Sequence, residues 1–142
     1  EILDVQENDY VLDLCAAPGG KSTQIASHLK KGYLVSNEID AKRAQILLSN
    51  MERMGVKNMA VTNTSVDKLA KIFNNCFDKI LVDAPCSGEG MIKKHDIALN
   101  NWSIENIELC ASRQKEILEY AYSMLKPGGT IVFNLYLCFR GR

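Results

Sequence analysis

The stretch Val-Leu-Asp-Leu-Cys-Ala-Ala-Pro-Gly-Gly-Lys-Ser, residues 11–22, joins an apolar strand to a helix through a turn of small residues. The strand is predicted over Tyr10–Cys15 and the helix over Lys21–Lys31, where apolar residues recur at helical spacing. Glycines in such a turn let the backbone approach a ligand and present its amide groups. The stretch therefore predicts the first unit of a ligand-binding α/β domain.

Strands and helices alternate along the rest of the chain. Such alternation favours right-handed crossovers, and these build a parallel, doubly wound sheet with helices on both faces. Ligands of such sheets bind at the carboxyl ends of the strands. The further predicted strands are Tyr33–Asn37, Asn58–Thr62, Lys79–Asp83 and Thr130–Leu135, the helices are Ala41–Met54, Val66–Ile72 and Ile104–Leu125, and Ala84–Asn101 is a long connection.

The apolar residues also predict which sides of these elements are buried. Residues 80–82 form an unbroken apolar run, which is typical of a parallel strand covered on both faces. In the helices, apolar residues three or four positions apart predict the inner side. These residues are Ala44, Leu47, Leu48 and Met51 in the helix 41–54, and Ile107, Ala111, Leu118, Ala121 and Leu125 in the helix 104–125.

Composition and charge exclude several classes of protein. The chain has 142 residues, 46% of them hydrophobic, which argues against disorder. Its 17 basic and 17 acidic side chains cancel, so any contact with nucleic acid is expected to be local or made by another segment. No apolar run reaches the roughly 18 residues of a membrane span. The five cysteines contain no Cys-x-x-Cys pair, so we expect reduced thiols in a cytoplasmic protein and no metal site.

The glycine turn fits neither of two common nucleotide-binding patterns. A phosphate-binding loop would need a glycine where Cys15 stands, and the spacing G-x-G-x-x-G is missing. Glu38, nineteen positions after Gly19, ends the next predicted strand, and an acid about there commonly binds ribose hydroxyls. Alone, the turn could be structural and the acid simply solvated. Together they predict a cofactor that carries adenosine and needs no pyrophosphate.

A second cluster follows the strand Lys79–Asp83. The stretch Asp-Ala-Pro-Cys-Ser-Gly-Glu-Gly-Met, residues 83–91, combines an acid, a rigid proline and a thiol. A single cysteine is most often a small buried hydrophobe. Cys86, however, lies in a loop rich in glycine and serine, where that interpretation is weaker. The position predicts that these side chains meet both substrate and cofactor.

The chain resembles the Nop/Sun family of RNA (cytosine-5) methyltransferases, particularly its bacterial 16S ribosomal RNA members. Four stretches carry the resemblance: residues 11–22, Asn37-Glu38, residues 83–91 and Leu125-Lys126-Pro127-Gly128-Gly129. The resemblance implies a Rossmann-like fold with strand order 3-2-1-4-5 and S-adenosylmethionine as the methyl donor. It also implies that residues 1–142 are a catalytic-domain fragment, without the RNA-docking region before them and the last strands after them.

The resemblance further implies roles for single residues. Cytosine C5 becomes nucleophilic only when a thiolate adds to C6 while N3 is protonated or hydrogen-bonded. Asp83 would orient the base at N3, Lys21 would lie near both ligands, and Cys86 would assist product release. Ser65 stands where relatives often have an aspartate that contacts adenosine. The cofactor-binding residues would be Cys15, Ala16, Ala17, Pro18, Gly19, Gly20, Lys21, Glu38, Arg43, Ser65 and Asp83.

The tail departs from the family pattern, in which a Ser-Thr-Cys-Thr run after the fifth strand carries the nucleophile. Tyr136 holds the nucleophile position here, and Cys138 comes two residues later. In a strand that shift moves a side chain by about 6–7 Å. One hypothesis is a shifted reading frame, because residues 133–136, when written with the codons TTC-AAC-TTG-TAC, contain Ser-Thr-Cys one base along. The functional alternatives are cofactor binding without turnover and a nucleotide-dependent oxidoreductase.

Overall fold

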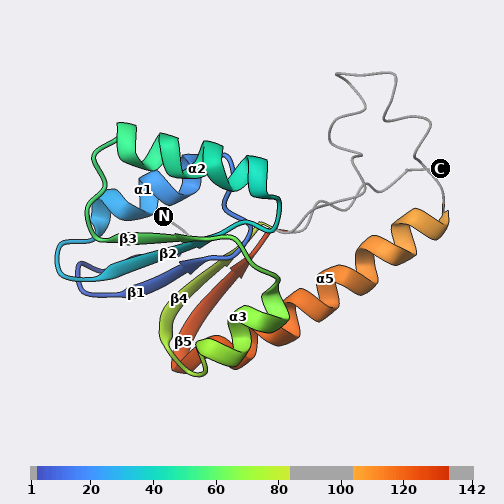
Figure 1. Cartoon of the computed structure of the whole chain (residues 1–142). Coiled ribbons are helices and arrows are strands. Elements are labelled where there is room, and N and C mark those ends of the chain that lie inside the picture. Colours follow the sequence, from blue (N-terminus) through green and yellow to red (C-terminus); the bar gives the residue numbers. More distant parts are fainter. Residues whose placement is uncertain (1–2, 84–103, 135–142) are drawn as a thin grey trace, which may run out of the picture.

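One parallel sheet of five strands, in the order β3-β2-β1-β4-β5, forms the centre of the protein (Figure 1). The computed structural model describes residues 3–83 and 104–134, without the side chains of residues 104–111. The predicted doubly wound architecture and its strand order are confirmed. The strands are β1 Tyr10–Asp13, β2 Tyr33–Asn37, β3 Met59–Thr62, β4 Phe77–Val82 and β5 Leu125–Phe133, and the helices are α1 Gly20–His28, α2 Ala41–Arg53, α3 Val66–Ile72 and α5 Ile104–Met124.

The strand order places the switch point between β1 and β4. β1 runs parallel to β2, where Asp13 pairs with Ser36, and parallel to β4, where Asp13 pairs with Leu81. The chain leaves β1 for α1 on one face, whereas β4 leads on to β5 on the other side of β1. The carboxyl ends of β1, β2 and β4 therefore lie together, where ligands of such sheets bind.

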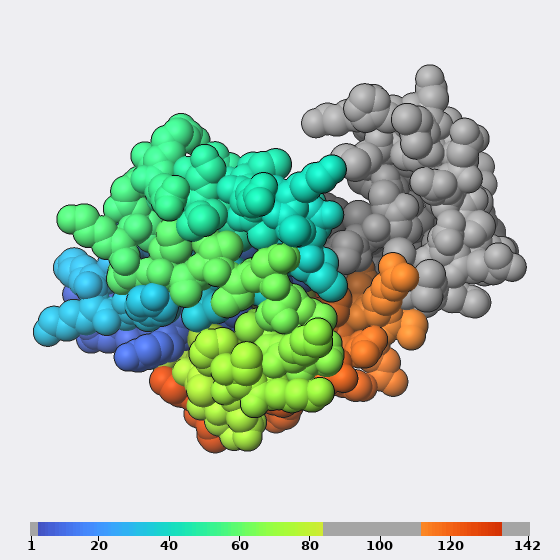
Figure 2. Space-filling model, in the orientation of Figure 1, coloured from blue at the N-terminus to red at the C-terminus, as the bar shows by residue number. Residues whose placement is uncertain are grey.

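Helices cover both faces of the sheet. Figure 1 shows α1 and α2 on one face and α3 and α5 on the other. In the same orientation, residues from α2 through α3 form much of the visible surface (Figure 2). The first core contains Val11, Ile25, Ala26, Leu29, Leu34, Leu47, Met51 and Leu81, and the second contains Leu12, Leu14, Val35, Leu69, Phe77, Ile80, Val82, Ala121 and Met124. The prediction that residues 80–82 are covered on both faces is confirmed.

The inner sides of two helices are narrower than predicted. Ala44, Leu47 and Met51 are buried as expected, but Leu48 is 39% exposed. Adjacent helical residues point about 100° apart, so Leu48 turns away from the sheet when Leu47 faces it. Leu118 in α5 is likewise exposed rather than buried, while Ala121 is fully buried. The helical spacing was right, and the extra leucine in each helix was wrongly assigned to the core.

Leu47 and its neighbour offer a direct stability test of this packing. We expect Leu47→Ala to lower the free energy of unfolding by about 2–5 kcal/mol, because a fully buried leucine leaves a cavity. Leu48→Ala, the matched control, should lower it by less than about 1 kcal/mol because the side chain is already partly solvated. Urea unfolding followed by circular dichroism measures both. Equal losses for the two variants would contradict this assignment of the inner face.

The boundary between α5 and β5 also differs from the prediction. α5 ends at Met124, and Leu125, predicted as its last buried residue, starts β5 and is half-buried. Leu125 pairs with Phe77 and Thr130 pairs with Lys79, so residues 126–129, which fall between the predicted helix Ile104–Leu125 and the predicted strand Thr130–Leu135, form an irregularity inside β5. Packing explains the glycine there, since a Cβ on Gly129 would come within 2.8 Å of the Asp78 carbonyl oxygen.

The remaining differences concern where individual strands and helices begin or end. β1 stops at Asp13 rather than Cys15, β4 begins two residues earlier than predicted, and α1 ends at His28 rather than Lys31. The predicted connection Ala84–Asn101 and the predicted strand end Leu135 lie outside the described residues. Within residues 3–83 and 104–134, no helix combines the length and apolar character needed to cross a membrane.

Candidate functional site

The turn after β1 is fixed by backbone hydrogen bonds to both neighbouring strands. The Leu14 amide donates to Leu81 O and the Ala16 amide to Asn37 O, each at 2.9 Å. The Gly19 amide then donates to Ala16 O at 2.8 Å, and Gly19 has φ 108°, a conformation that favours glycine. A Cβ on Gly19 would lie 2.9 Å from Leu47 Cδ1. The glycine therefore allows both the turn and its close approach to α2.

Two polar side chains of α2 donate hydrogen bonds to backbone carbonyls of this turn. Arg43 Nη2 donates to Ala17 O at 3.0 Å, and Asn50 Nδ2 donates to Pro18 O at 2.8 Å. α2 is itself capped, because Asp40 Oδ1 accepts from the Arg43 amide at 2.9 Å. The turn thus keeps its shape through hydrogen bonds from a neighbouring helix.

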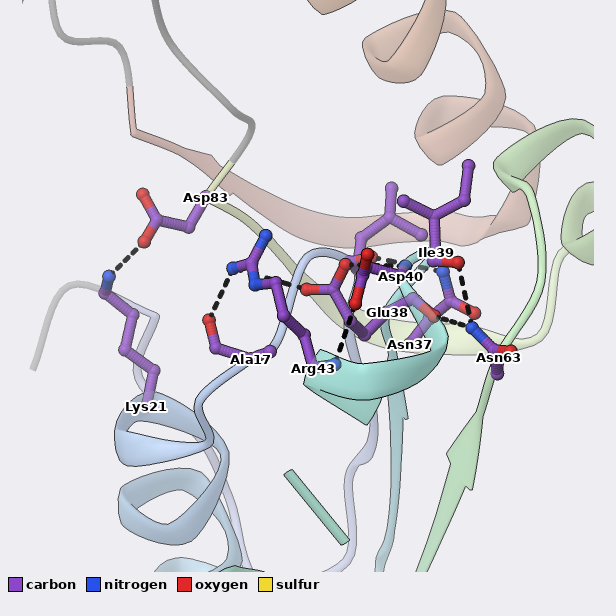
Figure 3. Close-up of polar contacts among 10 residues, drawn as sticks. Ala17, Lys21, Asn37, Glu38, Ile39, Asp40, Arg43, Asn63 and Asp83 are labelled. Carbon is purple, nitrogen blue, oxygen red and sulfur yellow. Dashed lines mark hydrogen bonds and ion pairs between the residues drawn. The ribbon is translucent and has the colours of Figure 1, made fainter. Parts of the chain in front are cut away.

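Glu38 follows β2 and is almost completely buried, with 3% of its surface exposed. Its Oε1 accepts from the Asp40 amide at 3.1 Å, and its Oε2 lies 3.4 Å from Arg43 Nη2. The same guanidinium therefore contacts both the acid and the glycine turn (Figure 3). This arrangement keeps a carboxylate at the strand end, where it can accept hydrogen bonds from a diol.

Asn63 fixes the backbone on which Glu38 stands. Its Nδ2 donates to Glu38 O at 2.7 Å and to Ile39 O at 2.9 Å, as drawn in Figure 3. The Ile39 side chain is 68% exposed although it is apolar. Apolar surface next to a carboxylate suits a flat, hydrophobic ring attached to a ribose.

Ser65, predicted to contact adenosine, is the residue before α3. Its hydroxyl group hydrogen-bonds the Asp67 carboxylate and lowers the pKa of that carboxyl.

Lys21 and Asp83 meet across the sheet edge as an ion pair. Lys21 is in the first turn of α1 and Asp83 directly follows β4, and Figure 3 shows the two side chains pointing toward one another. Asn134 Nδ2 donates to the other carboxylate oxygen, Oδ1, at 3.0 Å. Asp83 is thus oriented from both sides while its side chain stays 27% exposed. A partly solvated, oriented carboxylate next to an ammonium group can make polar contacts with a ligand at the strand ends.

Cys15 lies in the turn but lacks the character of a nucleophile. Burial raises the pKa of its thiol to about 12, and the negative charges of Asp13, Glu38 and Asp83 act in the same direction. The thiol therefore stays protonated at neutral pH, whereas a nucleophilic cysteine needs a lowered pKa. The role of Cys15 in the cofactor-binding turn stays a prediction.

A cavity of about 150 Å³ opens between the turn and β1. Its lining residues are Asp13, Cys15, Ala16, Ala17, Pro18, Gly20 and Lys21. A larger open cavity of about 1060 Å³ lies on the α1 side of β4 and β5 and shares Lys21 with the smaller one. Small side chains at the turn, a buried acid one strand away and an exposed apolar side chain next to it fit an adenosine-bearing cofactor. Cys15–Lys21, Glu38 and Arg43 would hold it.

The structure brings most of the predicted site residues together. Cys15–Lys21, Glu38, Arg43 and Asp83 follow neighbouring strand ends, as Figure 3 shows for the labelled residues among them. Cys86 and Cys138 lie outside the described residues. Sequence reasoning missed Asn50, Asn63 and Asn134, whose amides hold the site from α2, from the turn after β3 and from the end of β5. The only available signal was a polar residue directly after a predicted strand, which applies to Asn63 but not to Asn134, because Asn134 lies inside the predicted strand Thr130–Leu135.

Comparison with known proteins agrees with this geometry. Residues 1–136 match the family described as 16S rRNA methyltransferase RsmB/F. The chain is 45% identical over 127 residues to ribosomal RNA small subunit methyltransferase F of Vibrio cholerae, and 44% identical over 131 residues to that of Aeromonas salmonicida. The crystal structure of NSun6 from Pyrococcus horikoshii with SFG superposes with a TM-score of 0.80 at 32% identity.

The matched regions cover nearly all of this chain and a minority of each relative. The match to the Vibrio protein covers 89% of this chain and 27% of that protein, and the match to the Aeromonas protein covers 92% and 28% in the same order. The match to NSun6 covers 93% of this chain and 34% of the NSun6 chain. The chain therefore spans about a quarter of the length of the curated relatives that it matches. With the fold, the strand-end site and these matches in agreement, the chain belongs to the RsmB/F family of 16S rRNA methyltransferases.

Proposed function

We propose that this chain binds S-adenosylmethionine and serves in the methylation of cytidine C5 in ribosomal RNA, within the cytoplasm. The observation that carries the proposal is the meeting of three features at neighbouring strand ends. These are the glycine turn after β1, the buried Glu38 after β2 and the Lys21–Asp83 ion pair beside β4. Membership of an rRNA methyltransferase family supports the choice of substrate.

The residues of the turn and of β2 would hold the cofactor. Gly19 and Gly20 allow its close approach, and nothing within 4 Å occupies the space where a Cβ on Gly20 would lie. Glu38 would accept hydrogen bonds from both ribose hydroxyls, with Arg43 and the Asp40 amide keeping its carboxylate in place. The cofactor supplies an activated methyl group on a sulfonium.

Lys21 and Asp83 would act on the target base. Cytosine C5 attacks a methyl sulfonium only after a thiolate has added to C6, and that addition requires a hydrogen-bonded or protonated N3. Asp83 projects from the end of β4 with its direction fixed by Lys21 and Asn134. In this proposal the Asp83 carboxyl group shares a proton with N3 of the base. The ammonium group of Lys21 lies next to Asp83 as a source of protons. Cys86 assists release, and Cys138 stands in for the nucleophile.

Glu38→Gln provides the binding test. We expect the affinity for S-adenosylhomocysteine, measured by isothermal titration calorimetry, to fall about 10- to 100-fold, because a hydrogen bond to a charged group contributes about 1.5–3 kcal/mol. Glu52→Gln is the matched control, since Glu52 is exposed near the end of α2 and should leave the affinity unchanged. An affinity of Glu38→Gln equal to that of the unaltered protein would contradict the ribose-binding role.

Turnover is tested separately from binding. RNA carrying tritium at cytidine C5 releases it to water when C5 is methylated, so release that depends on S-adenosylmethionine measures the complete reaction. The proposed function predicts both a calorimetric signal with the cofactor and release of tritium. The absence of any heat with the cofactor would contradict the proposal at its first step.

Cofactor binding without turnover is the second candidate function. The observation that favours it is the position of Cys138, two residues beyond the place where relatives carry their nucleophile, which is Tyr136 here. Nucleophilic attack tolerates a displacement of only about 1 Å. Binding of S-adenosylmethionine with no release of tritium would support this candidate.

A further inference from the structure

Two tyrosines are exposed to solvent at the amino edge of the sheet, where the strands begin. Tyr10 starts β1 and Tyr33 starts β2, and the two residues pair directly across the parallel strands. They are 51% and 38% exposed. Val11 and Leu34 pack into the first core, so the alternation of side chains along a strand turns both tyrosines to the other face of the sheet. Two aromatic side chains therefore project from the same face of adjacent strands.

Two exposed lysines lie next to the same strand starts. Lys31 lies two residues before β2, and Lys57 lies in the loop between α2 and β3. Among the side chains of residues 3–83 and 112–134, no carboxylate forms an ion pair with either of them. Asn58 Nδ2 donates to Gly32 O at 2.7 Å, which joins the two loops. The two positive charges are thus held on neighbouring loops at the edge that carries the tyrosines.

The acidic side chains at this edge already have polar partners. Glu7 pairs with Lys30 at 2.5 Å, and Asp78 pairs with Lys126 at 2.8 Å. Asp9 Oδ2 accepts a hydrogen bond from a backbone amide at 2.8 Å. The positive charge of the two unpaired lysines is therefore not cancelled by a direct contact.

Lys57 also lines a hollow of about 440 Å³ between α1 and the loop after α2. Lys30, which follows α1, lines the same hollow. Ammonium groups contact the phosphate oxygens of nucleic acids and position the backbone without reading its sequence. The hollow therefore offers room for part of a sugar–phosphate backbone next to Lys57.

The opposite edge of the sheet, at the strand ends, is less suited to RNA phosphates. Glu38, Asp40 and Asp83 lie there, and the nearby Arg43 and Lys21 are already paired with Glu38 and Asp83. Carboxylates repel phosphate groups at short range. RNA whose target base lies at the strand ends would therefore gain affinity from positive charge elsewhere on the protein.

We propose that Tyr10, Tyr33, Lys31 and Lys57, which we call the amino-edge surface, bind a single-stranded stretch of the substrate RNA away from the strand-end site. This rests on the proposed function, which makes RNA the substrate. Bases of any sequence stack on tyrosine rings, and lysines contact the phosphates between them. Figure 1 shows the starts of β1, β2 and β3 at the edge opposite to the end of β4. The amino-edge surface would thus hold the RNA without contacting the target base.

A purely structural role for the tyrosines makes a different prediction. Lys126 Nζ lies 5.1 Å from the centre of the Tyr10 ring, a contact that stabilises the folded chain. If the rings only covered the edge of the sheet, replacing one by alanine would lower the free energy of unfolding. The affinity of the folded protein for RNA would then stay unchanged.

Fluorescence anisotropy with a labelled single-stranded RNA of about 12 nucleotides tests the stacking. For Tyr33→Ala we expect the affinity to fall about 5- to 100-fold, the effect of losing one ring that stacks on a base. Tyr33→Phe keeps the ring and should bind within about twofold of the original affinity. Tyr122→Ala is the matched control, because Tyr122 is 74% exposed on α5 and should leave the affinity unchanged. An abasic strand of the same length should bind Tyr33→Ala and the unaltered protein alike.

The salt dependence of the same affinity tests the lysines. Each phosphate contact with a single strand adds about 0.7 to the slope of log affinity against log salt, because counterions are released. Lys57→Gln should reduce that slope by about 0.7 and weaken the strand with bases and the abasic strand by the same factor. Lys115→Gln, at an exposed lysine of α5, should change neither quantity.

The tritium-release assay connects the amino-edge surface to the reaction. A contact that holds RNA equally before and during the reaction lowers KM and leaves kcat unchanged. Tyr33→Ala should therefore raise the KM for RNA without changing kcat. The calorimetric affinity for S-adenosylhomocysteine should also stay the same, because the amino-edge surface lies away from the cofactor.

Each outcome supports or overturns the amino-edge surface. Equal RNA affinities for Tyr33→Ala and Tyr33→Phe, or an unchanged salt slope in Lys57→Gln, would overturn it, and an acidic protein as the true partner would give the same result. If tritium is released with the same KM in Tyr33→Ala, the surface is wrong while the proposed function stands. If the unaltered protein neither binds RNA nor releases tritium, both fail. Should Tyr33→Ala not fold, the salt slope of Lys57→Gln decides.

Discussion

Asp83→Asn is expected to lower the rate of tritium release from cytidine C5 by about 100- to 10,000-fold, the usual effect of removing an acid–base group. Asparagine keeps the size of the side chain and can still accept from Asn134, but it cannot hold a proton for N3 or pair with the Lys21 ammonium. Because the change acts on the reaction rather than on the ribose contact, the affinity for the cofactor should change by much less than the rate.

Asp78→Asn is the matched control for this variant. Asp78 lies near the start of the same strand, and it too forms an ion pair with a lysine, Lys126, at 2.8 Å. The same substitution therefore removes a comparable ion pair at the opposite end of β4. We expect the rate of tritium release to stay unchanged there. Equal rates for Asp83→Asn and Asp78→Asn would contradict the role of Asp83.

Gly32→Ala is expected to have the largest effect on stability. A Cβ at this position would lie 2.2 Å from Asp9 O and 2.9 Å from Asp9 N, so backbone atoms would have to move. The Gly32 amide also donates to Glu7 O at 2.9 Å, which prevents a simple displacement of the chain. Overpacking of this kind lowers the free energy of unfolding by about 3 kcal/mol or more. Thermal unfolding followed by circular dichroism measures the loss.

Gly20→Ala is the control for this clash. A Cβ on Gly20 would meet no atom within 4 Å, and the residue starts α1. Alanine is the better helix former, so the midpoint of thermal unfolding should stay the same or rise slightly. A loss of stability in Gly20→Ala as large as in Gly32→Ala would show that the close contact at Gly32 is not the cause.

Much of the fold could be predicted because local and tertiary preferences agree along the chain. The strands β2 and β3 and the helix α3 lie almost where their apolar residues predicted them. The errors occur where one rule left two choices open. Leu47 and Leu48 are both apolar neighbours on a helix, and only packing against the sheet selects the first. At residues 125–129, a helix stop and a strand irregularity have the same Lys-Pro-Gly-Gly signature.

The candidate site was predictable in its charged residues and not in its amides. Glu38 and Asp83 follow apolar strands, and each became a candidate only together with a second motif, the glycine turn for Glu38 and the loop of residues 84–91 for Asp83. Asn63 and Asn50 act on backbone carbonyls in segments 24 or more positions away along the chain, and such contacts exist only after the fold has formed. The burial of Asp13 was likewise not predicted, because the sequence of residues 11–22 does not show which of its polar side chains is enclosed by the fold.

The position of α2 makes the two halves of the site dependent on one element. Arg43 and Asn50 hold the carbonyls of the glycine turn, and Arg43 also contacts the carboxylate of Glu38. Local opening of this helix would therefore remove the side-chain contacts to the turn and to the acid in the same event. Ligand recognition at the two places is then coupled through α2, while the backbone hydrogen bonds that join the turn to β2 and β4 would remain.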